Sequence, residues 1–123
     1  LLGRGGAGAV WRAHETGTER GVALKLLESS RDAGQRARFE REGELTAALQ
    51  HPGIVRIHAA GEHDGRPWIA YELVAGGVTA EHALRSLDRR GRLQLLRDVA
   101  RAVGHAHARG IVHRDLKPQN ILV

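Results

Sequence analysis

The sequence contains no cysteine, no long hydrophobic run and few aromatic residues. The absence of cysteine excludes a disulfide scaffold and a thiolate metal site, and it is consistent with a cytoplasmic protein. No run approaches the roughly 18 consecutive apolar residues that a membrane-spanning helix requires. The N-terminus also lacks the charged, apolar and small-residue order of a signal peptide. We therefore expect a soluble, cytoplasmic chain without a membrane segment.

Aromatic residues are scarce, and positive charge is dispersed along the chain. Trp11, Phe39, Trp68 and Tyr71 are the only aromatics, too few for a platform that stacks single-stranded nucleic acid. The net charge of +5 comes from 19 basic and 14 acidic residues, which interleave in stretches such as 36–42, as on a solvated helix face. We therefore expect no nucleic-acid partner.

Apolar patterning divides the chain into a β-rich half and a helical half, which makes the fold class α+β. A hydrophobic content of 41% is that of a globular chain, and its length allows one modest core. The expected strands are three within residues 1–27, one at 54–57 and one at 68–74, the last two flanking a turn at 62–65. The expected helices are 33–49, capped by residues 29–32, then 79–86 and 92–108, the last ended by Gly110. Gly76-Gly77 marks the boundary between lobes at 1–77 and 78–123.

The long helix at 92–108 carries an apolar stripe along one side. Its members are Leu93, Leu96, Val99, Ala100, Val103 and His107. The other histidine near its end, His105, is two positions from His107 and points to a different face, so we expect no histidine metal site.

Residues 3–8, Gly-Arg-Gly-Gly-Ala-Gly, fit a loop whose backbone N–H groups approach phosphate because glycine carries no side chain. Dinucleotide-binding folds use the same pattern and an acid about 20 residues on, where Glu28 stands, but they need a helix directly after the last glycine. Val10, Trp11 and Gly17 disfavour a helix there, so we expect a strand after the loop instead. The pattern therefore predicts a phosphate-binding hairpin, with an ordinary glycine hairpin as the alternative.

Lys25 and Lys117 are the only lysines among the 19 basic residues. Either these positions need a compact ammonium, or the sequence simply favours arginine elsewhere. Lys25 stands in the apolar run 22–27, where an isolated charge is costly without a nearby anion. Glu42 in the predicted helix is a candidate partner, and a lysine on an edge strand is the alternative.

Residues 113–120, His-Arg-Asp-Leu-Lys-Pro-Gln-Asn, carry the most specific pattern. Asp115 followed five residues later by Asn120 fits a loop that positions a hydroxyl group and holds a metal ion. Lys117 between them is suited to neutralising phosphate. A chance match to all eight positions, at this distance from the glycine loop and Lys25, is much rarer than a functional one.

Together the segments 2–10, 22–25 and 113–120 resemble the eukaryotic-type protein kinases, and most of all the bacterial serine/threonine kinases. The resemblance implies a five-stranded antiparallel N-lobe sheet with one helix, followed by the first helices and the catalytic loop of a helical C-lobe. It also implies ATP-dependent phosphorylation of serine or threonine hydroxyls on protein substrates, with ATP and Mg²⁺ as cofactors. The pattern at 114–118 disfavours a small-molecule phosphotransferase of the same fold.

The same resemblance assigns roles to residues. Asp115 would accept the proton of the substrate hydroxyl, Lys117 would steady the transferred phosphoryl group, and Asn120 would bind Mg²⁺. Lys25 would hold the α and β phosphates and pair with Glu42. Tyr71 falls at the gatekeeper position, next to the hinge. The nucleotide-binding residues implied are Leu2, Gly3, Gly5, Gly6, Gly8, Val10, Ala23, Lys25, Glu72 and Val74.

Some positions depart from the family pattern. Ala7 stands at the loop tip where a bulkier side chain is frequent. Gly43 follows Glu42, and a glycine inside a helix costs about 1 kcal/mol relative to alanine, which predicts an easily displaced helix. The first residue is Leu1 where an initiator methionine would stand, and the family's Asp-Phe-Gly segment would follow Val123. We therefore expect a chain cut at both ends and inactive by itself. The alternative is a noncatalytic nucleotide-binding or interaction module of kinase fold.

Overall fold

A computed structural model describes residues 1–5, 8–27 and 33–123, and the chain forms two compact units. The first unit comprises residues 1–50 and 55–73, and the second comprises 51–54 and 74–123. The change of unit after Leu73 lies near the glycine pair where the sequence places the lobe boundary. No helix among the described residues is sufficiently long and apolar to span a bilayer.

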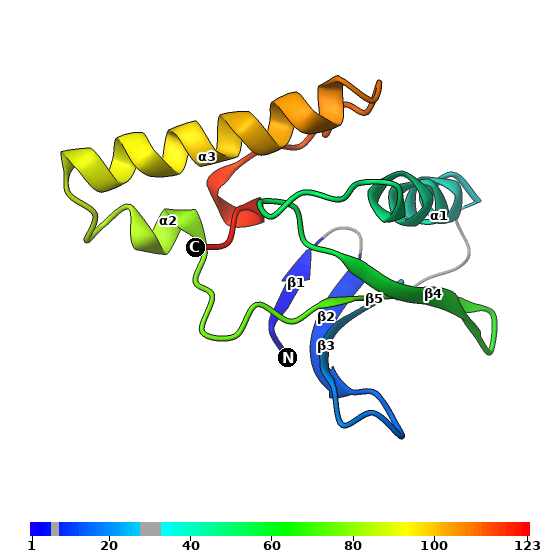
Figure 1. Ribbon diagram of the computed structural model, residues 1–123. Coiled ribbons are helices and arrows are strands. Elements are labelled where there is room, and N and C mark those ends of the chain that lie inside the picture. The colour runs from blue at the N-terminus through cyan, green and yellow to red at the C-terminus, as the bar shows by residue number, and fades with distance from the viewer. Residues whose placement is uncertain (6–7, 28–32) are drawn as a thin grey trace. The chain divides into compact units, whose positions relative to one another are not determined.

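The first unit is a five-stranded sheet accompanied by one described helix, α1 (Ala33–Ala47) (Figure 1). The strand order is β1-β2-β3-β5-β4, and each neighbouring pair is antiparallel, which confirms the predicted sheet. The strands are β1 (Gly3–Gly5), β2 (Gly8–His14), β3 (Gly21–Leu26), β4 (Ile57–His63) and β5 (Arg66–Glu72). The predicted capping residues of α1, at 29–32, lie outside the described residues.

Strand β4 corrects the sequence-based prediction. The sequence predicts a strand at 54–57, whereas β4 begins at Ile57 and continues to the hairpin turn. Asp64 and Gly65 have φ values of 49° and 72°, and positive φ at both positions is the geometry of a two-residue type I′ turn. Pairing proceeds from this turn through residues 59–61, which are Ala-Ala-Gly and have low strand propensity. Tertiary pairing, and not local propensity, makes this segment a strand.

Strand register assigns the side chains to two faces of the sheet, because residues directly opposite each other share a face. Lys25 lies opposite Val10 on β2 and Ile69 on β5. Phe39 of α1 is buried in a core cluster with Leu27 and Ile69. Helix α1 therefore packs on the face that carries Lys25.

The second unit contains α2 (Ala80–Ala83), α3 (Arg89–His107) and a short 3₁₀ turn, η1 (Pro118–Asn120). Helix α3 begins three residues earlier than predicted because Asp88 caps it, accepting a hydrogen bond from the Gly91 amide at 2.7 Å. Gly110 ends this helix as predicted. It has φ 73°, and the following amide donates to the Ala106 carbonyl in a Schellman arrangement.

The apolar stripe predicted on α3 is not the buried face of the helix, because four of its six members are exposed and the other two, Val99 and Val103, are half-buried. Leu93 and Leu96 are 58% and 66% exposed, whereas Ala102 and Ala106 are buried. The buried face is therefore rotated from the predicted one. Small side chains permit close packing there, and a pattern search for large apolar residues does not detect them.

Part of the connection between α1 and β4, residues 51–54, belongs to the second unit. The ring of His51 lies 4.9 Å from that of His105 on α3, and His51 Nδ1 accepts a hydrogen bond from the Gly53 amide at 3.0 Å. A Cβ built on Gly53 would come within 3.2 Å of the Ala102 Cβ, so the backbone is close to α3 at this point. Residues 51–54 are thus held by α3 although α1 and β4 lie in the first unit.

Candidate functional site

Strands β1 and β2 carry the glycines predicted to cover phosphate. Gly8 has φ 118°, and a Cβ there would come within 2.1 Å of the Leu26 carbonyl oxygen, so the fold itself requires glycine at that position. Among the described residues, no heavy atom lies within 4 Å of a Cβ built on Gly3. Packing within the described residues therefore does not explain why position 3 is a glycine. The residue is exposed, so its backbone is accessible to a ligand. Gly6 and Ala7 lie outside the described residues.

The strand that follows this loop excludes the dinucleotide-binding alternative, which needs a helix there. The first residues of the chain extend the pairing, because the Leu2 amide donates to the Val10 carbonyl at 2.8 Å. Ala23 lies opposite Tyr71, two positions along β3 from Lys25. Val10, Ala23 and Lys25 thus share one face of the sheet.

Lys25 is half-buried on β3 beneath helix α1. Its Nζ lies 5.5 Å from the centre of the Phe39 ring, within the range of a cation–π contact. The sequence analysis missed this role of Phe39, although its spacing of three positions from Glu42 places both residues on one side of the helix. The side chain of Glu42 lies outside the described residues, so its pairing with Lys25 stays a prediction.

Besides the contacts of Phe39, two others join the described part of α1 to the sheet. A Cβ built on Gly43 would lie 3.3 Å from Ile69 Cδ1, so the glycine allows the helix to approach β5 closely. Arg36 contacts Glu62 of β4 through Nη2, while its Nε donates to Glu40 on the same helix at 2.9 Å. From the sequence alone, Gly43 is predicted only to weaken the helix. The structure shows that it also lies at the contact between the helix and Ile69 of β5.

Glu72 and Val74, both predicted to bind nucleotide, stand at the end of β5 and just beyond it. The Glu72 amide donates to the Arg56 carbonyl at 2.8 Å, beyond the regular pairing of β4 with β5. Tyr71 packs against the buried core cluster. Val74 is 38% exposed and belongs to the second unit.

In the second unit, residues 113–120 form a loop that brings three predicted site residues together. Lys117 Nζ lies 2.8 Å from Asp115 Oδ2, and Asn120 Nδ2 lies 3.0 Å from the same oxygen. Asn120 also donates to the Asp115 backbone carbonyl at 2.8 Å. The turn η1 carries Asn120 back toward Asp115 and closes the loop.

The electrostatics of this loop favour an ionised Asp115. Hydrogen bonds from Lys117 and then Asn120 lower the pKa of the Asp115 carboxyl, so it is anionic at neutral pH. Among the described residues, the side-chain donors converge on Oδ2 and not on Oδ1. His113 Nδ1 accepts from the Asp115 amide at 3.3 Å, and Arg114 has φ 63°, an uncommon conformation for a residue with a side chain.

The donor set suits Mg²⁺ held together with phosphate. No group of three or more His, Cys, Asp or Glu side chains that could hold a metal occurs within residues 1–5, 8–27 and 33–123. Mg²⁺ is usually bound through one or two side-chain oxygens together with substrate phosphates and water. The Asn120 amide nitrogen is bonded to Asp115, so its amide oxygen is the end of the side chain able to bind a cation.

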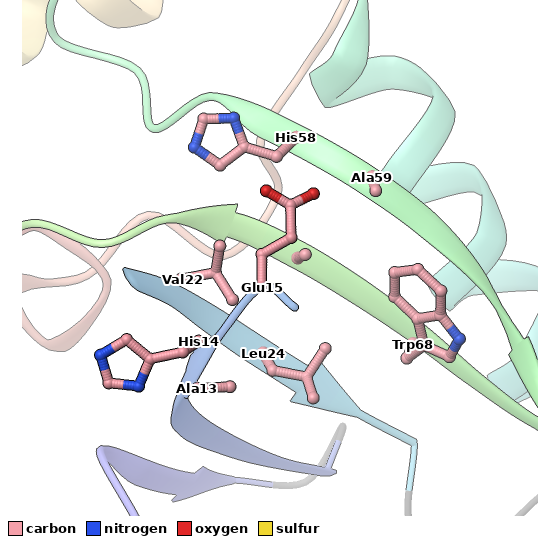
Figure 2. Close-up of a pocket in the computed structure, with 9 residues that line it drawn as sticks. Ala13, His14, Glu15, Val22, Leu24, His58, Ala59 and Trp68 are labelled. Carbon is pink, nitrogen blue, oxygen red and sulfur yellow. The ribbon is translucent and has the colours of Figure 1, made fainter. Parts of the chain in front are cut away.

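A separate pocket of about 180 Å³ lies on the opposite face of the sheet (Figure 2). Leu24 lines it, and successive residues of a strand alternate between faces, so the pocket is across the sheet from Lys25. No residue predicted to bind nucleotide takes part. Its lining residues are Ala13, His14, Glu15, Val22, Leu24, His58, Ala59, Trp68 and Ala70.

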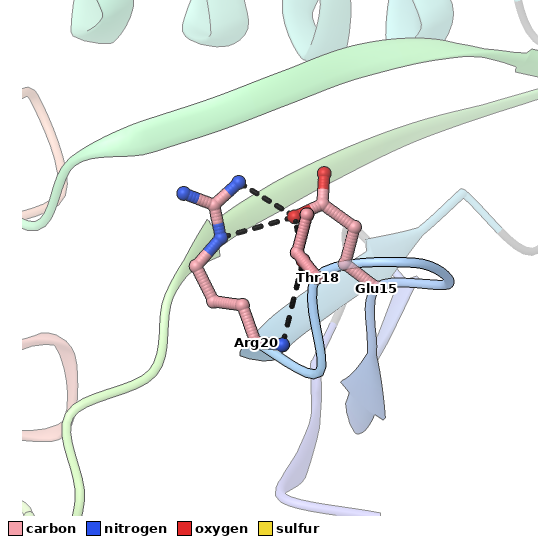
Figure 3. Close-up of polar contacts among 3 residues, drawn as sticks. All are labelled: Glu15, Thr18 and Arg20. Atoms are coloured by element: carbon pink, nitrogen blue, oxygen red, sulfur yellow. Dashed lines mark hydrogen bonds and ion pairs between the residues drawn. The ribbon is translucent and has the colours of Figure 1, made fainter.

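Glu15 at this pocket is held by the turn between β2 and β3 (Figure 3). Its Oε2 accepts hydrogen bonds from Thr18 Oγ1 at 2.7 Å and from Arg20 Nη2 at 2.6 Å. These contacts, from Thr18 first and then Arg20, lower the pKa of the Glu15 carboxyl. They order a turn in which Glu19 has φ 55°.

The family model for the protein kinase domain matches residues 1–123 of this chain. The chain belongs to the protein kinase domain family. The serine/threonine-protein kinase PknJ of Mycobacterium bovis is 44% identical over 127 residues, covering 100% of this chain and 21% of that protein. PknF of Mycobacterium tuberculosis is 41% identical over 129 residues, covering 99% of this chain and 27% of that protein. This kinase chain thus spans about a fifth to a quarter of the length of these relatives.

The kinase fold is also evident in solved structures. The crystal structure of the Mycobacterium tuberculosis PknI kinase domain aligns with a TM-score of 0.82 at 36% identity, covering 98% of this chain and 51% of that domain. These findings confirm the predicted family, its bacterial serine/threonine relatives and the predicted fold class. Membership of the kinase family implies ATP, Mg²⁺ and a protein substrate.

Proposed function

We propose that the natural protein containing this chain transfers the γ-phosphoryl group of ATP to serine or threonine hydroxyls of protein substrates, in the cytoplasm. The observation that carries this proposal is the convergence of Lys117 and Asn120 on the Asp115 carboxylate, at 2.8 and 3.0 Å. Phosphoryl transfer to a hydroxyl needs a proton acceptor, a cation and an oxygen ligand for Mg²⁺. These three residues supply one of each.

Each residue of the loop has a distinct role in this reaction. The substrate hydroxyl donates a hydrogen bond to the Asp115 carboxylate, which orients the attacking oxygen. Asp115 takes the proton as that oxygen bonds to the γ-phosphorus and the bond to the ADP oxygen breaks. The Lys117 ammonium offsets negative charge on the transferred group. Mg²⁺, when held by Asn120, neutralises charge on the phosphate oxygens.

All the residues proposed to bind ATP except Val74 belong to the first unit. The amides of Gly3, Gly5, Gly6 and Gly8 cover the phosphates, and Lys25, oriented by Glu42, holds the α and β phosphates. Leu2, Val10 and Ala23 contact adenine, and Glu72 and Val74 present backbone groups to it. The shared face of Val10, Ala23 and Lys25 supports this assignment.

The test is phosphorylation of a generic protein substrate by the natural protein, with labelled ATP and Mg²⁺. We expect Asp115→Asn to lower the rate by about 10² to 10⁴, as loss of a positioned base does. Lys25→Met should also abolish most activity while leaving the fold intact. Asp98→Asn, at an exposed position on α3, is the matched control and should retain the parent rate. ATP binding with no transfer by the parent protein would contradict the proposal and favour a noncatalytic module.

Residues 1–123 alone are expected to show no turnover. The sequence contains no Asp-Phe-Gly segment, which in the family supplies a further Mg²⁺ ligand. The chain covers 51% of the PknI kinase domain, so half of such a domain has no counterpart in it. Sustained transfer by purified residues 1–123, abolished by Asp115→Asn, would overturn this expectation.

A further inference from the structure

We propose that Arg36 and Glu62 are positioning residues that hold helix α1 on strand β4 and thereby direct Glu42 toward Lys25. This inference rests on the proposed function, in which Glu42 orients Lys25. It assigns a role to an ion pair that joins two elements far apart in the sequence.

The Arg36 guanidinium bridges two carboxylates. Its Nη2 contacts Glu62 Oε2 on β4, and its Nε donates to Glu40 Oε1 at 2.9 Å on α1 itself. These bonds, to Glu40 first and then Glu62, raise the pKa of Arg36. A guanidinium has a planar fork of donors, so holding two acceptors fixes its direction.

The pair acts at the edge of the sheet. Strand β4 is the last strand in the order β1-β2-β3-β5-β4, and α1 contacts both β4 and β5. The described residues also join α1 to the sheet through buried Phe39, over whose ring the Lys25 ammonium lies, and through the close approach of the backbone at Gly43. Apolar contacts attract without fixing direction, and Gly43 offers no side chain to lock the helix against Ile69. The ion pair of Arg36 with Glu62 adds a directional restraint to these contacts.

Rotation of α1 would move Glu42 directly. Arg36, Glu40 and Gly43 are spaced i, i+4 and i+7, so they run along one side of the helix, and Glu42 lies less than one turn from Glu40. Releasing Arg36 from Glu62 leaves Phe39 as the main anchor, about which the helix can turn. The side chains of Arg36 and Glu62 are 35% and 47% exposed, and pairs of this kind shift an equilibrium by about two- to fivefold.

The experiment uses charge reversal in the natural protein. Arg36→Glu and Glu62→Arg should each lower kcat about two- to fivefold at saturating ATP and substrate. The double exchange places an arginine where it can contact both acidic side chains on α1, so it should restore most of the rate. Arg41→Glu and Glu44→Arg, exposed on the same helix, are the matched controls and should leave the rate unchanged.

A second measurement separates positioning from general stability. In a Glu42→Gln background, Arg36→Glu should cause no further loss of rate, because the residue it positions is already absent. An equal loss in both backgrounds, or a loss that the double exchange does not restore, would overturn the proposal. If Lys25→Met and Asp115→Asn keep the parent rate, the proposed function fails. If they abolish activity while the reversals behave like the controls, only the positioning role fails.

Discussion

Replacing Gly43 with alanine tests why a glycine stands in the middle of α1. In an unconstrained helix alanine is more stable by about 1 kcal/mol. Here the new Cβ would lie 3.3 Å from Ile69 Cδ1, and Ile69 is only 1% exposed within the core. Overpacking of this kind typically costs about 1 to 3 kcal/mol. We therefore expect Gly43→Ala to lower the free energy of unfolding, by up to about 2 kcal/mol.

The effect of Gly43→Ala on the free energy of unfolding should change sign when Ile69 is shortened to valine. Ile69→Val removes Cδ1, the atom at 3.3 Å, and leaves Cγ1 at 3.7 Å, an ordinary contact distance. Alone, this substitution should cost about 0.5 to 1.5 kcal/mol. In the valine background, Gly43→Ala no longer meets a close contact and should stabilise the protein by about 1 kcal/mol, its helix-propensity gain.

The assay is urea unfolding of the parent, the two single variants and the double variant, followed by tryptophan fluorescence. Trp11 and Trp68 both lie in the first unit, so the fluorescence reports on the part of the chain that changes. The four free energies form a double-mutant cycle whose coupling isolates the contact. Equal effects of Gly43→Ala in the two backgrounds, or a full 1 kcal/mol gain in the parent, would refute the reasoning.

Two further predictions concern the second unit. Asp88→Ala removes the cap of α3 and should lower the free energy of unfolding by about 0.5 to 2 kcal/mol, measured by thermal melting followed by circular dichroism; an unchanged melting temperature would contradict the assigned cap. Burial, and then Arg109 and His51, lower the pKa of His105 from its ordinary 6.5, so the unfolded chain binds that proton more readily and stability should fall as the pH drops below 6.5. In thermal melts from pH 7.5 to 5, the melting temperature should fall less for His105→Gln than for the parent. Equal falls in the two proteins would exclude a contribution of His105 to the pH dependence of stability.

The loop at 113–120 is the part of the candidate site that local sequence predicts best. Asp115, Lys117 and Asn120 lie within six consecutive positions, and one short turn, η1, brings their polar atoms together. Their proximity therefore depends on few residues outside the loop. Phosphoryl transfer also restricts the residue types at these positions, which makes the pattern specific.

Contacts between distant segments were not predictable in the same way. The pair of Arg36 with Glu62 spans 26 positions and exists only because the turn at Asp64 and Gly65 sets the register of β4. Residues 59–61 have little strand propensity, so the sequence analysis placed the strand too early. Gly43 likewise appears unfavourable until the neighbouring Ile69 is known.

The path of the chain through the two units has a mechanical consequence. Because residues 51–54 belong to the second unit, the backbone passes between the units at three places, after Gln50, Ile54 and Leu73. No single cleavage can separate the units, and neither can be produced alone as one continuous segment. Gly53, in the segment that crosses into the second unit, lies beside Ala102 of α3. The backbone therefore links the two units on both sides of β4 and β5.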